Sequence, residues 1–202
     1  MKKIYIVMLF VIGAFSFSNA QESYWAINWD ITSAMGDTGD FVGGVNFRGV
    51  SVEGRYFIKK DMTIGGSLGW NTLYEKQDNL PPIEIEVEGY DGHLSGTQLH
   101  YLNTVPVLFT SHYYMEGFGK GKIFLGAGIG GVYAESRNDI GLRSIYNDSF
   151  GFAFQPEIGT MIPIGYAGSG LNIAVKYLYG TSAGDLDNLS TLTLSVGFGF
   201  LN

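Results

Sequence analysis

The chain of 202 residues carries 12 basic and 19 acidic residues, a formal net charge of −7, and contains no cysteine. The acidic balance argues against nucleic acid as a partner, and the lack of cysteine excludes disulfides and a lipid-modified cysteine. Thirty glycines accompany an aromatic content of 15%. This pair is unusual for a soluble enzyme, because glycine weakens ordinary strands and helices.

The first twenty residues have the layout of an export signal. Two lysines follow the first methionine, an apolar run covers 4–17, and Ala20 precedes the first polar pair. The run is shorter than the roughly 20 residues of a membrane-spanning helix. We therefore predict a signal peptide over 1–20 that is cleaved after Ala20, followed by a single domain over 21–202.

The rest of the chain alternates large apolar residues with small or polar ones, a period of two that is typical of β-strands. From Trp25 to Ile31, for example, the odd positions are apolar and the even positions are small or polar. The pattern recurs eight times. The predicted strands are 25–32, 49–58, 62–74, 105–113, 123–133, 150–162, 171–179 and 191–200.

The polar faces of these strands decide between two all-β architectures. In a soluble sandwich, Trp25, Trp29 and Phe152 would point into the core, and the polar face would be bulky and charged to meet water. Here the polar face is mainly glycine, serine and threonine, which fit inside a barrel of about eight strands. Since no other run approaches ~18 apolar residues, we predict an all-β, eight-stranded antiparallel transmembrane up-and-down β-barrel.

The connections between the predicted strands alternate in length. Outer-membrane barrels have short periplasmic turns and longer outer loops, so an even strand count places both ends of the domain in the periplasm. Pro106 interrupts the fourth strand, and we expect a bulge or a strand mouth there, because proline cannot donate to the ladder. Long connections are predicted near 34–44, 76–97, 137–148 and 181–189, and short ones at 59–61, 115–121 and 165–169.

Three segments carry a family resemblance. The sequence YLNTVPVL over 101–108, the tyrosine pair at 113–114 and the glycine-rich stretch over 124–130 resemble the small outer-membrane β-barrels of the OmpA, OmpX and OmpW type. The resemblance covers the whole exported domain and marks an architecture, not a function. It implies an outer-membrane location, in contact with membrane lipid and lipopolysaccharide.

The C-terminal segment over 194–200 resembles the sorting signal that the barrel-insertion machinery reads in that family. The aromatic residue that usually ends the signal is replaced here by Leu201 and Asn202. Recognition is therefore expected to depend on Phe198 and Phe200.

Five charged residues fall on the polar face of the predicted strands: Asp30, Glu53, Arg55, Glu157 and Lys176. Charges enclosed by a barrel wall must pair, because an unpaired buried charge costs several kcal/mol. We predict a static set of ion pairs that fills the lumen. The alternative is a polar gate or a proton path.

Two further motifs favour structural explanations. The glycines of 126–131 match a dinucleotide fingerprint, but no helix follows to receive the phosphates, so no cofactor is predicted. The run over 83–88 alternates aliphatic residues with three glutamates and is expected to form a hairpin with residues near 95–101. Its carboxylates could share a divalent cation, but a solvated edge that resists aggregation is the favoured interpretation, and no metal site is predicted.

The leading hypothesis is a non-enzymatic barrel with a packed polar lumen that interacts through outer loops whose partner is unknown. A narrow OmpW-like transport barrel for small or apolar solutes is the alternative. A lipid-modifying enzyme would need a histidine beside a serine or an acid at the outer rim. His93 and His100 lie in or near the longest loop, close to Asp91 and Ser95, whereas His112 is expected near the periplasmic end of the fourth strand.

Overall fold

The structure of the chain is a computed structural model. It describes residues 22–77, 83–87, 90–94, 98–117, 121–140, 143–164, 169–181 and 188–201. The predicted signal peptide and its cleavage site lie outside the described residues.

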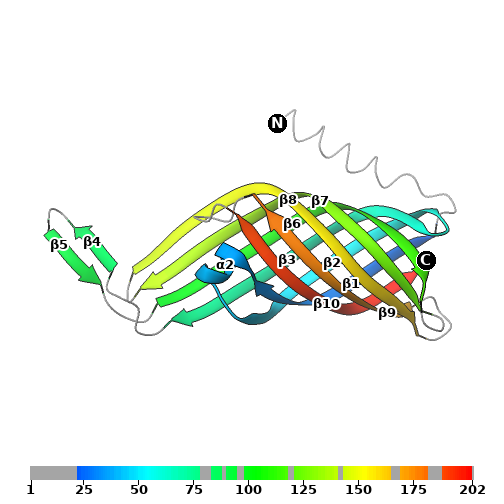
Figure 1. Cartoon of the computed structure of the whole chain (residues 1–202), viewed down its shortest axis with the longest axis horizontal. Coiled ribbons are helices and arrows are strands. Elements are labelled where there is room, and N and C mark those ends of the chain that lie inside the picture. The colour runs from blue at the N-terminus through cyan, green and yellow to red at the C-terminus, as the bar shows by residue number, and fades with distance from the viewer. Residues whose placement is uncertain are drawn as a thin grey trace, which may run out of the picture.

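In the described part of the chain, eight strands close into one antiparallel barrel in which neighbours follow the chain order (Figure 1). The last strand pairs with the first, Trp25 opposite Phe200, and completes the wall. The predicted fold class is therefore confirmed. The barrel strands are β1 (Ser23–Ala34), β2 (Val45–Lys59), β3 (Met62–Gln77), β6 (Gln98–Glu116), β7 (Lys122–Ile140), β8 (Arg143–Pro163), β9 (Ser169–Gly180) and β10 (Leu189–Leu201).

The alternation in the sequence sorts the side chains to the two sides of the wall. Trp25, Trp29 and Phe152 point outward and remain 43%, 51% and 56% exposed. Since these rings lie outside, the sandwich architecture is wrong. Asn28, which lies between Trp25 and Trp29 on β1, points into the lumen and is buried. The polar face of the strands is therefore the inner one.

Aromatic rings on the outer face cover glycines of the neighbouring strand. A Cβ atom on Gly54 would lie 2.9 Å from Trp25 Cζ3, and one on Gly131 would lie 2.3 Å from Phe150 Cζ. Each ring therefore occupies the space that a side chain on the glycine would need. This packing links the high glycine content to the high aromatic content of the chain.

Two prolines interrupt the hydrogen-bonded ladder without shifting it. Pairing between β3 and β6 stops after Leu68 and Val107 and resumes in the same register at Asn71 and Thr104, across the position of Pro106. The expectation of a bulge or strand mouth is wrong, because β6 continues through the proline and pairs on its other side with β7 without interruption. A missing N–H removes one ladder bond and does not by itself add a residue. Pro156 interrupts the pairing of β8 with β9 in the same way.

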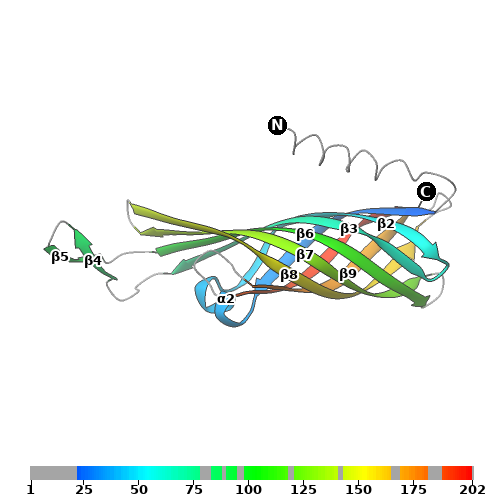
Figure 2. The ribbon, with the colours of Figure 1, turned by 90° about the horizontal axis from the view of Figure 1, so that it is seen from above.

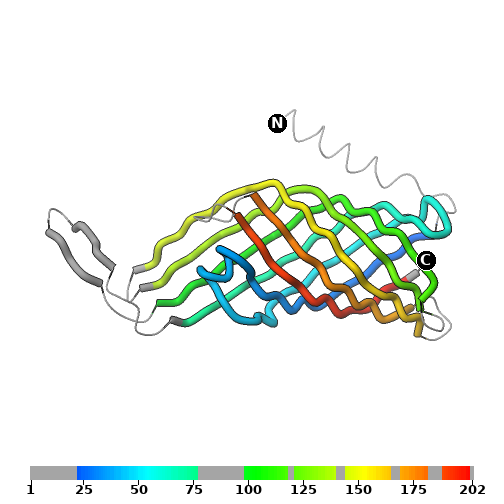
Figure 3. Tube along the Cα trace, in the orientation of Figure 1, coloured from blue at the N-terminus to red at the C-terminus, as the bar shows by residue number. Residues whose placement is uncertain are grey.

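The wall is much taller on one side than on the other. Strands β6, β7 and β8 have 19, 19 and 21 residues, whereas β1 and β9 have 12 each. A membrane crossing takes roughly 9–11 residues. The tall strands therefore run on well past the short ones at one end of the barrel (Figures 2 and 3). This end, where β1 runs into α2 and β10 begins, is called the mouth.

Two predicted connections differ in the structure. The expected long loop over 137–148 is mostly wall, since β7 continues to Ile140 and β8 begins at Arg143. The run over Ile83–Val87 forms β4, but it pairs with β5 (Tyr90–Leu94) as a separate two-stranded sheet, not with 95–101. Pairing within so short a segment needs only a two-residue connection. The side chains of its glutamates lie outside the described part, so the cation prediction stays untested.

A helix that was not predicted occupies the first long connection. This is α2 (Gly36–Phe41), a single short helix at the mouth (Figure 1). Among the described residues, no helix is long and apolar enough to cross a membrane. Gly36, the first residue of α2, and Gly44, three residues past its end, have φ values of 54° and 80°, in the left-handed region that favours glycine.

Candidate functional site in the barrel lumen

The five charged residues singled out in the sequence all point into the lumen. Each is at most 7% exposed. They come from four strands: Asp30 from β1, Glu53 and Arg55 from β2, Glu157 from β8 and Lys176 from β9. Inward orientation follows from the alternation, because each lies an even number of residues from a buried neighbour on its strand.

Arg55 is the centre of the ion-pair network. Its Nη2 atom forms an ion pair with Glu53 and lies 3.1 Å from Glu157 Oε1, while Nη1 donates to Tyr114 Oη at 2.8 Å. Strands β2 and β8 stand on opposite sides of the closed barrel. The Arg55–Glu157 contact therefore spans the full width of the lumen.

Two further residues complete this network. Lys176 Nζ forms an ion pair with Glu53 Oε1, and His112 Nε2 contacts Glu157 Oε1. We call Glu53, Arg55, His112, Glu157 and Lys176 the lumen cluster. Each carboxylate contacts at least two cationic or ring N–H groups, which is the arrangement that a buried charge requires.

Aromatic rings enclose the lumen cluster toward the end of the barrel that carries the termini. Arg55 Cζ lies 4.6 Å from the centre of the Phe124 ring and 5.3 Å from that of Tyr24. Glycines make room for these rings: a Cβ on Gly159 would lie 2.4 Å from Phe124 Cζ, and one on Gly199 2.3 Å from Tyr24 Oη. The inner glycines thus let bulky side chains fill a narrow lumen.

Neutral polar side chains extend the network toward the mouth. Asn28 Nδ2 donates to Glu53 Oε1 at 3.2 Å, and Asn172 Nδ2 donates to Asn28 Oδ1 at 2.9 Å. Asp30 does not pair directly with a cation in the described contacts; its carboxylate accepts a hydrogen bond from Ser195 Oγ. The ionic and neutral groups together form one continuous polar layer.

Glu53, His112 and Glu157 also form a candidate metal-ligand set. One donor atom from each lies within 4.8 Å of the others, and carboxylate and imidazole groups are common metal ligands. However, Arg55 lies between the two carboxylates, and Lys176 holds Glu53 as well. The side chains already supply the positive charge that the carboxylates need, so the geometry favours an ion-pair network over a metal centre.

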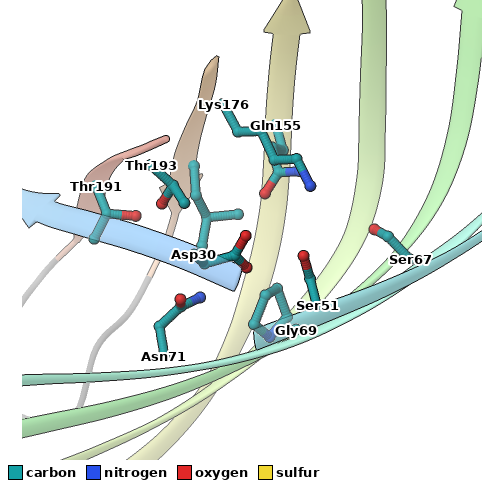
Figure 4. A pocket seen from close by; sticks show the side chains of 11 residues that line it. Asp30, Ser51, Ser67, Gly69, Asn71, Gln155, Lys176, Thr191 and Thr193 are labelled. Carbon is teal, nitrogen blue, oxygen red and sulfur yellow. The ribbon is translucent and has the colours of Figure 1, made fainter. Parts of the chain in front are cut away.

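A small cavity lies on the mouth side of the lumen cluster (Figure 4). Its volume is about 20 Å³, room for roughly one water molecule. Lys176 and Gln155 line it on one side and Ser51 and Asn71 on the other, with the Asp30 carboxylate between them. The cavity is too small to hold a solute.

An apolar cluster closes the lumen between this cavity and the mouth. The predicted polar filling therefore covers only the part of the lumen toward the termini. Hydrophobic side chains reach the lumen here because the inward positions of the tall strands change from polar to aliphatic. The buried members are Val42, Leu73, Leu102, Leu108, Val132, Ala134, Ala153, Leu178 and Leu189.

Helix α2 is held in the mouth by buried polar contacts. Thr38 Oγ1 accepts a hydrogen bond from Ser190 N at 2.9 Å and donates to Asn188 O at 3.3 Å. The backbone N of Gly43 donates to Glu75 Oε2 at 2.6 Å. These contacts seat Val42, which follows α2, against the apolar cluster.

Two of the histidines weighed for a lipid-modifying site, His100 and His112, have described side chains. His100 lies on β6, not in the longest loop; its ring packs 4.7 Å from Phe41, and its Nδ1 lies 2.6 Å from Phe41 O. Its other ring nitrogen lies 3.2 Å from Gln98 Oε1. His112 is buried in the lumen cluster. The side chain of His93 lies outside the described part.

Sequence reasoning did not assign His112 and Tyr114 to the network, although the signal was present. Val105, Val107 and Phe109 mark the outward positions of the fourth predicted strand, so the intervening even positions point inward. Both residues follow this parity and are buried.

Two other predicted features can be placed. Gly126, Gly128 and Gly131 lie within the continuous strand β7, which leaves no helix for a nucleotide. Phe198 and Phe200 lie on the outer face of β10, 60% and 50% exposed. Their role in sorting stays a prediction.

Closure of eight antiparallel strands round a packed lumen, with an apolar outer surface, defines the class of small outer-membrane β-barrels. A solved structure of this class matches the chain over about nine-tenths of its length. No protein-family model matches the chain, and no curated protein is similar to it in sequence.

Three of the matching structures illustrate the likeness. Neisserial surface protein A is 12% identical, with a TM-score of 0.53, over 90% of this chain and 97% of that chain. OprG from Pseudomonas aeruginosa is 13% identical, with a TM-score of 0.47, over 91% and 97%. Ail of Yersinia pestis, in complex with the heparin analogue sucrose octasulfate, is 12% identical, with a TM-score of 0.47, over 89% and 99%. At these identities the likeness concerns the fold alone.

Proposed function

We propose that the protein is a non-enzymatic outer-membrane barrel with a closed lumen, and that it acts through the tall side of its wall. The observation that carries the proposal is the double closure of the lumen. The lumen cluster spans the barrel at one level, and the apolar cluster with α2 fills it at another. A solute would have to displace both.

The proposed orientation places the mouth outside the cell. β1 begins and β10 ends at the opposite end of the barrel. Short connections join β2 to β3 and β8 to β9 at that end. Short turns are typical of the periplasmic side and long loops of the outer side. Export by an N-terminal signal peptide and insertion that depends on Phe198 and Phe200 belong to the same proposal.

The tall side then stands outside the membrane as an exposed sheet. Strands β6 to β8 exceed the roughly 9–11 residues of a crossing by about as many again. Their outward-facing ends carry Tyr101, Arg137 and Tyr146, with Arg137 Cζ 5.1 Å and 5.4 Å from the two ring centres. Aromatic and arginine side chains are those most enriched at binding interfaces, which supports a contact role for this surface.

Conductance in planar bilayers tests the closed lumen. The proposal predicts no steady single-channel steps for the purified full barrel. The alternative, a narrow transport barrel for small or apolar solutes, predicts either steps or accelerated entry of a probe solute into vesicles. Vesicles that contain the barrel should therefore take up neither glucose nor a small apolar dye faster than empty vesicles; faster uptake of either would overturn the closed lumen.

A shortened hairpin tests the role of the tall side. Replacing residues 137–146 with a two-residue Asn-Gly turn would remove the exposed end of β7 and β8 and leave the lumen residues in place. The variant should keep its heat-modifiable migration on gels. Cells that express the variant should adhere less to immobilised extracellular-matrix protein than cells that express the full barrel. Equal binding by the full and shortened barrels would contradict the proposal.

A further inference from the structure

An exposed cationic residue, Arg48, interrupts the apolar outer face of β2 between Phe47 and Val50. Val50 and Val52 are exposed on the outer face, and Arg48 follows on the same face, two residues nearer the mouth. Arg48 is exposed, and its Cζ atom lies 5.7 Å from the centre of the Tyr74 ring on β3. Among the described residues, Arg48 forms no ion pair.

Two apolar grooves flank Val50 just below Arg48. One has a volume of about 450 Å³, the other about 320 Å³, and Val50 lines both. Trp29 forms a wall of the first groove and Trp70 a wall of the second. The remaining apolar walls of the grooves are Ile27, Leu171, Val196 and Phe198 in the first, and Val52, Leu68 and Val105 in the second.

Aromatic contacts fix the upper edge of the first groove. Trp29 Nε1 donates a hydrogen bond to Phe47 O at 2.8 Å, and the Trp29 and Phe47 rings lie 6.1 Å apart. An indole with its N–H bound at the polar edge of an apolar surface is typical of a membrane interface. Arg48 follows Phe47 directly, so its guanidinium lies beside this aromatic edge, where a lipid headgroup would meet it.

We propose that Arg48 and the two grooves bind a lipid of the outer leaflet whose headgroup carries a net negative phosphate monoester. Its phosphate would contact the Arg48 guanidinium, which matches phosphate oxygens in geometry and charge. Its acyl chains would lie in the grooves on either side of Val50. The site is continuous with the apolar membrane-facing surface, so a lipid reaches it without leaving the bilayer. The inference rests on the orientation in the proposed function.

Glu75, the acid that follows Tyr74 on β3, accepts a hydrogen bond from the backbone N of Gly43, and the acids on the outer face of the tall side lie farther away. The outward acids Glu135, which is half-buried, and Asp148, which is exposed, face each other on β7 and β8. Three strand spacings separate β7 from β2 round the wall, roughly 14 Å at ~4.8 Å per strand. This exceeds the Debye length of about 8 Å at physiological ionic strength.

Tryptophan quenching by brominated lipids tests the site. The chain has three tryptophans, of which Trp25 packs on Gly54 outside both grooves. The W25F variant, in phosphatidylcholine vesicles, reports on Trp29 and Trp70 alone. Phosphatidic acid with brominated chains should bind about fivefold more tightly than brominated phosphatidylcholine. Equal quenching by the two lipids would overturn the proposal.

Matched variants locate the effect. R48Q should bring the ratio of the affinities for phosphatidic acid and phosphatidylcholine close to one. K122Q removes the same charge at the opposite end of the wall and should leave this ratio unchanged. A preference that survives R48Q, or that falls equally in both variants, would reject the site. V50F, which fills the grooves, should weaken quenching by either lipid. All variants should keep heat-modifiable migration.

Two arms separate the sources of failure. Millimolar inorganic phosphate should leave the quenching unchanged. If free phosphate displaces the brominated lipid, the site binds phosphate and not a membrane lipid. Conductance is independent of the outer surface. A conducting barrel with an intact lipid preference would overturn the proposed function alone, and a closed barrel without preference would overturn this inference alone.

Discussion

Arg55 and Glu157 belong to strands that face each other across the barrel, and Arg55 Nη2 lies 3.1 Å from Glu157 Oε1. Around the closed wall, four steps separate β2 from β8 in either direction. A contact between opposite walls crosses the axis of the barrel. The stability of the wall and the closure of the lumen therefore depend on the same pair.

Replacing Arg55 with methionine should destabilise the folded barrel by about 3–5 kcal/mol, because two carboxylates would remain buried without their shared cation. Urea unfolding from phosphatidylcholine vesicles measures the change. R137M serves as the control, since Arg137 pairs with Asp139 on the exposed surface, and should change stability far less. The double variant R55M/E157L should recover part of the loss. A loss below about 1 kcal/mol in R55M would contradict the assignment.

Gly126 is required by the packing of His112. A Cβ at this position would lie 2.3 Å from His112 Cδ2, so G126A should cost about 1–3 kcal/mol through overpacking. G66A on the outer face is the matched control, because the nearest atom to its Cβ would be Leu108 O at 3.4 Å. The two variants should differ clearly in urea midpoint. Equal midpoints would mean that His112 does not fill this space.

Thr38 attaches α2 to the end of β10. Thr38→Val keeps the shape of the side chain but leaves the Ser190 amide without its acceptor, an expected local cost of about 1–3 kcal/mol. Hydrogen exchange of the Ser190 amide should accelerate accordingly, by about one to two orders of magnitude. Asp40→Asn, at an exposed position of α2, should leave this exchange unchanged. If Thr38→Val exchanges at the original rate, α2 is held by other contacts.

Asp139 lies beyond the apolar part of β7, and its contact with Arg137 should be visible in a titration. The hydrogen bonds that Arg137 donates hold the pKa of the Asp139 carboxyl below its ordinary value. Because the pKa is lowered in the folded state, the contact stabilises the fold above the ordinary aspartate pKa and is lost as pH falls through the lowered value. Carbon-detected NMR of the carboxyl should show the low midpoint, and R137Q should return it to the ordinary range. An unchanged midpoint in R137Q would mean that the contact with Arg137 does not lower the pKa of Asp139.

The alternation of side chains was enough to predict the barrel, because lipid outside and a narrow lumen inside impose opposite demands on successive residues. The same parity brings Glu53 and Glu157 into one lumen. It does not tell which carboxylate meets Arg55, since that depends on the stagger of strands remote in the sequence.

The mouth was harder to anticipate for a different reason. Tyr101 and Arg137 continue the alternation of their strands past the membrane, and nothing local marks where lipid gives way to water. Helix α2 is six residues long and too short to show a helical period. Its position depends on Thr38 meeting the backbone of β10, a contact between distant segments.

The unequal strand lengths give the molecule a direction within the plane of the membrane. A barrel with an even rim would present the same height on every side, whereas in this one β6 to β8 rise past β9, β10 and β1. Rotation of the barrel about its axis therefore changes which neighbour in the membrane faces the tall part of the wall and which faces the low part.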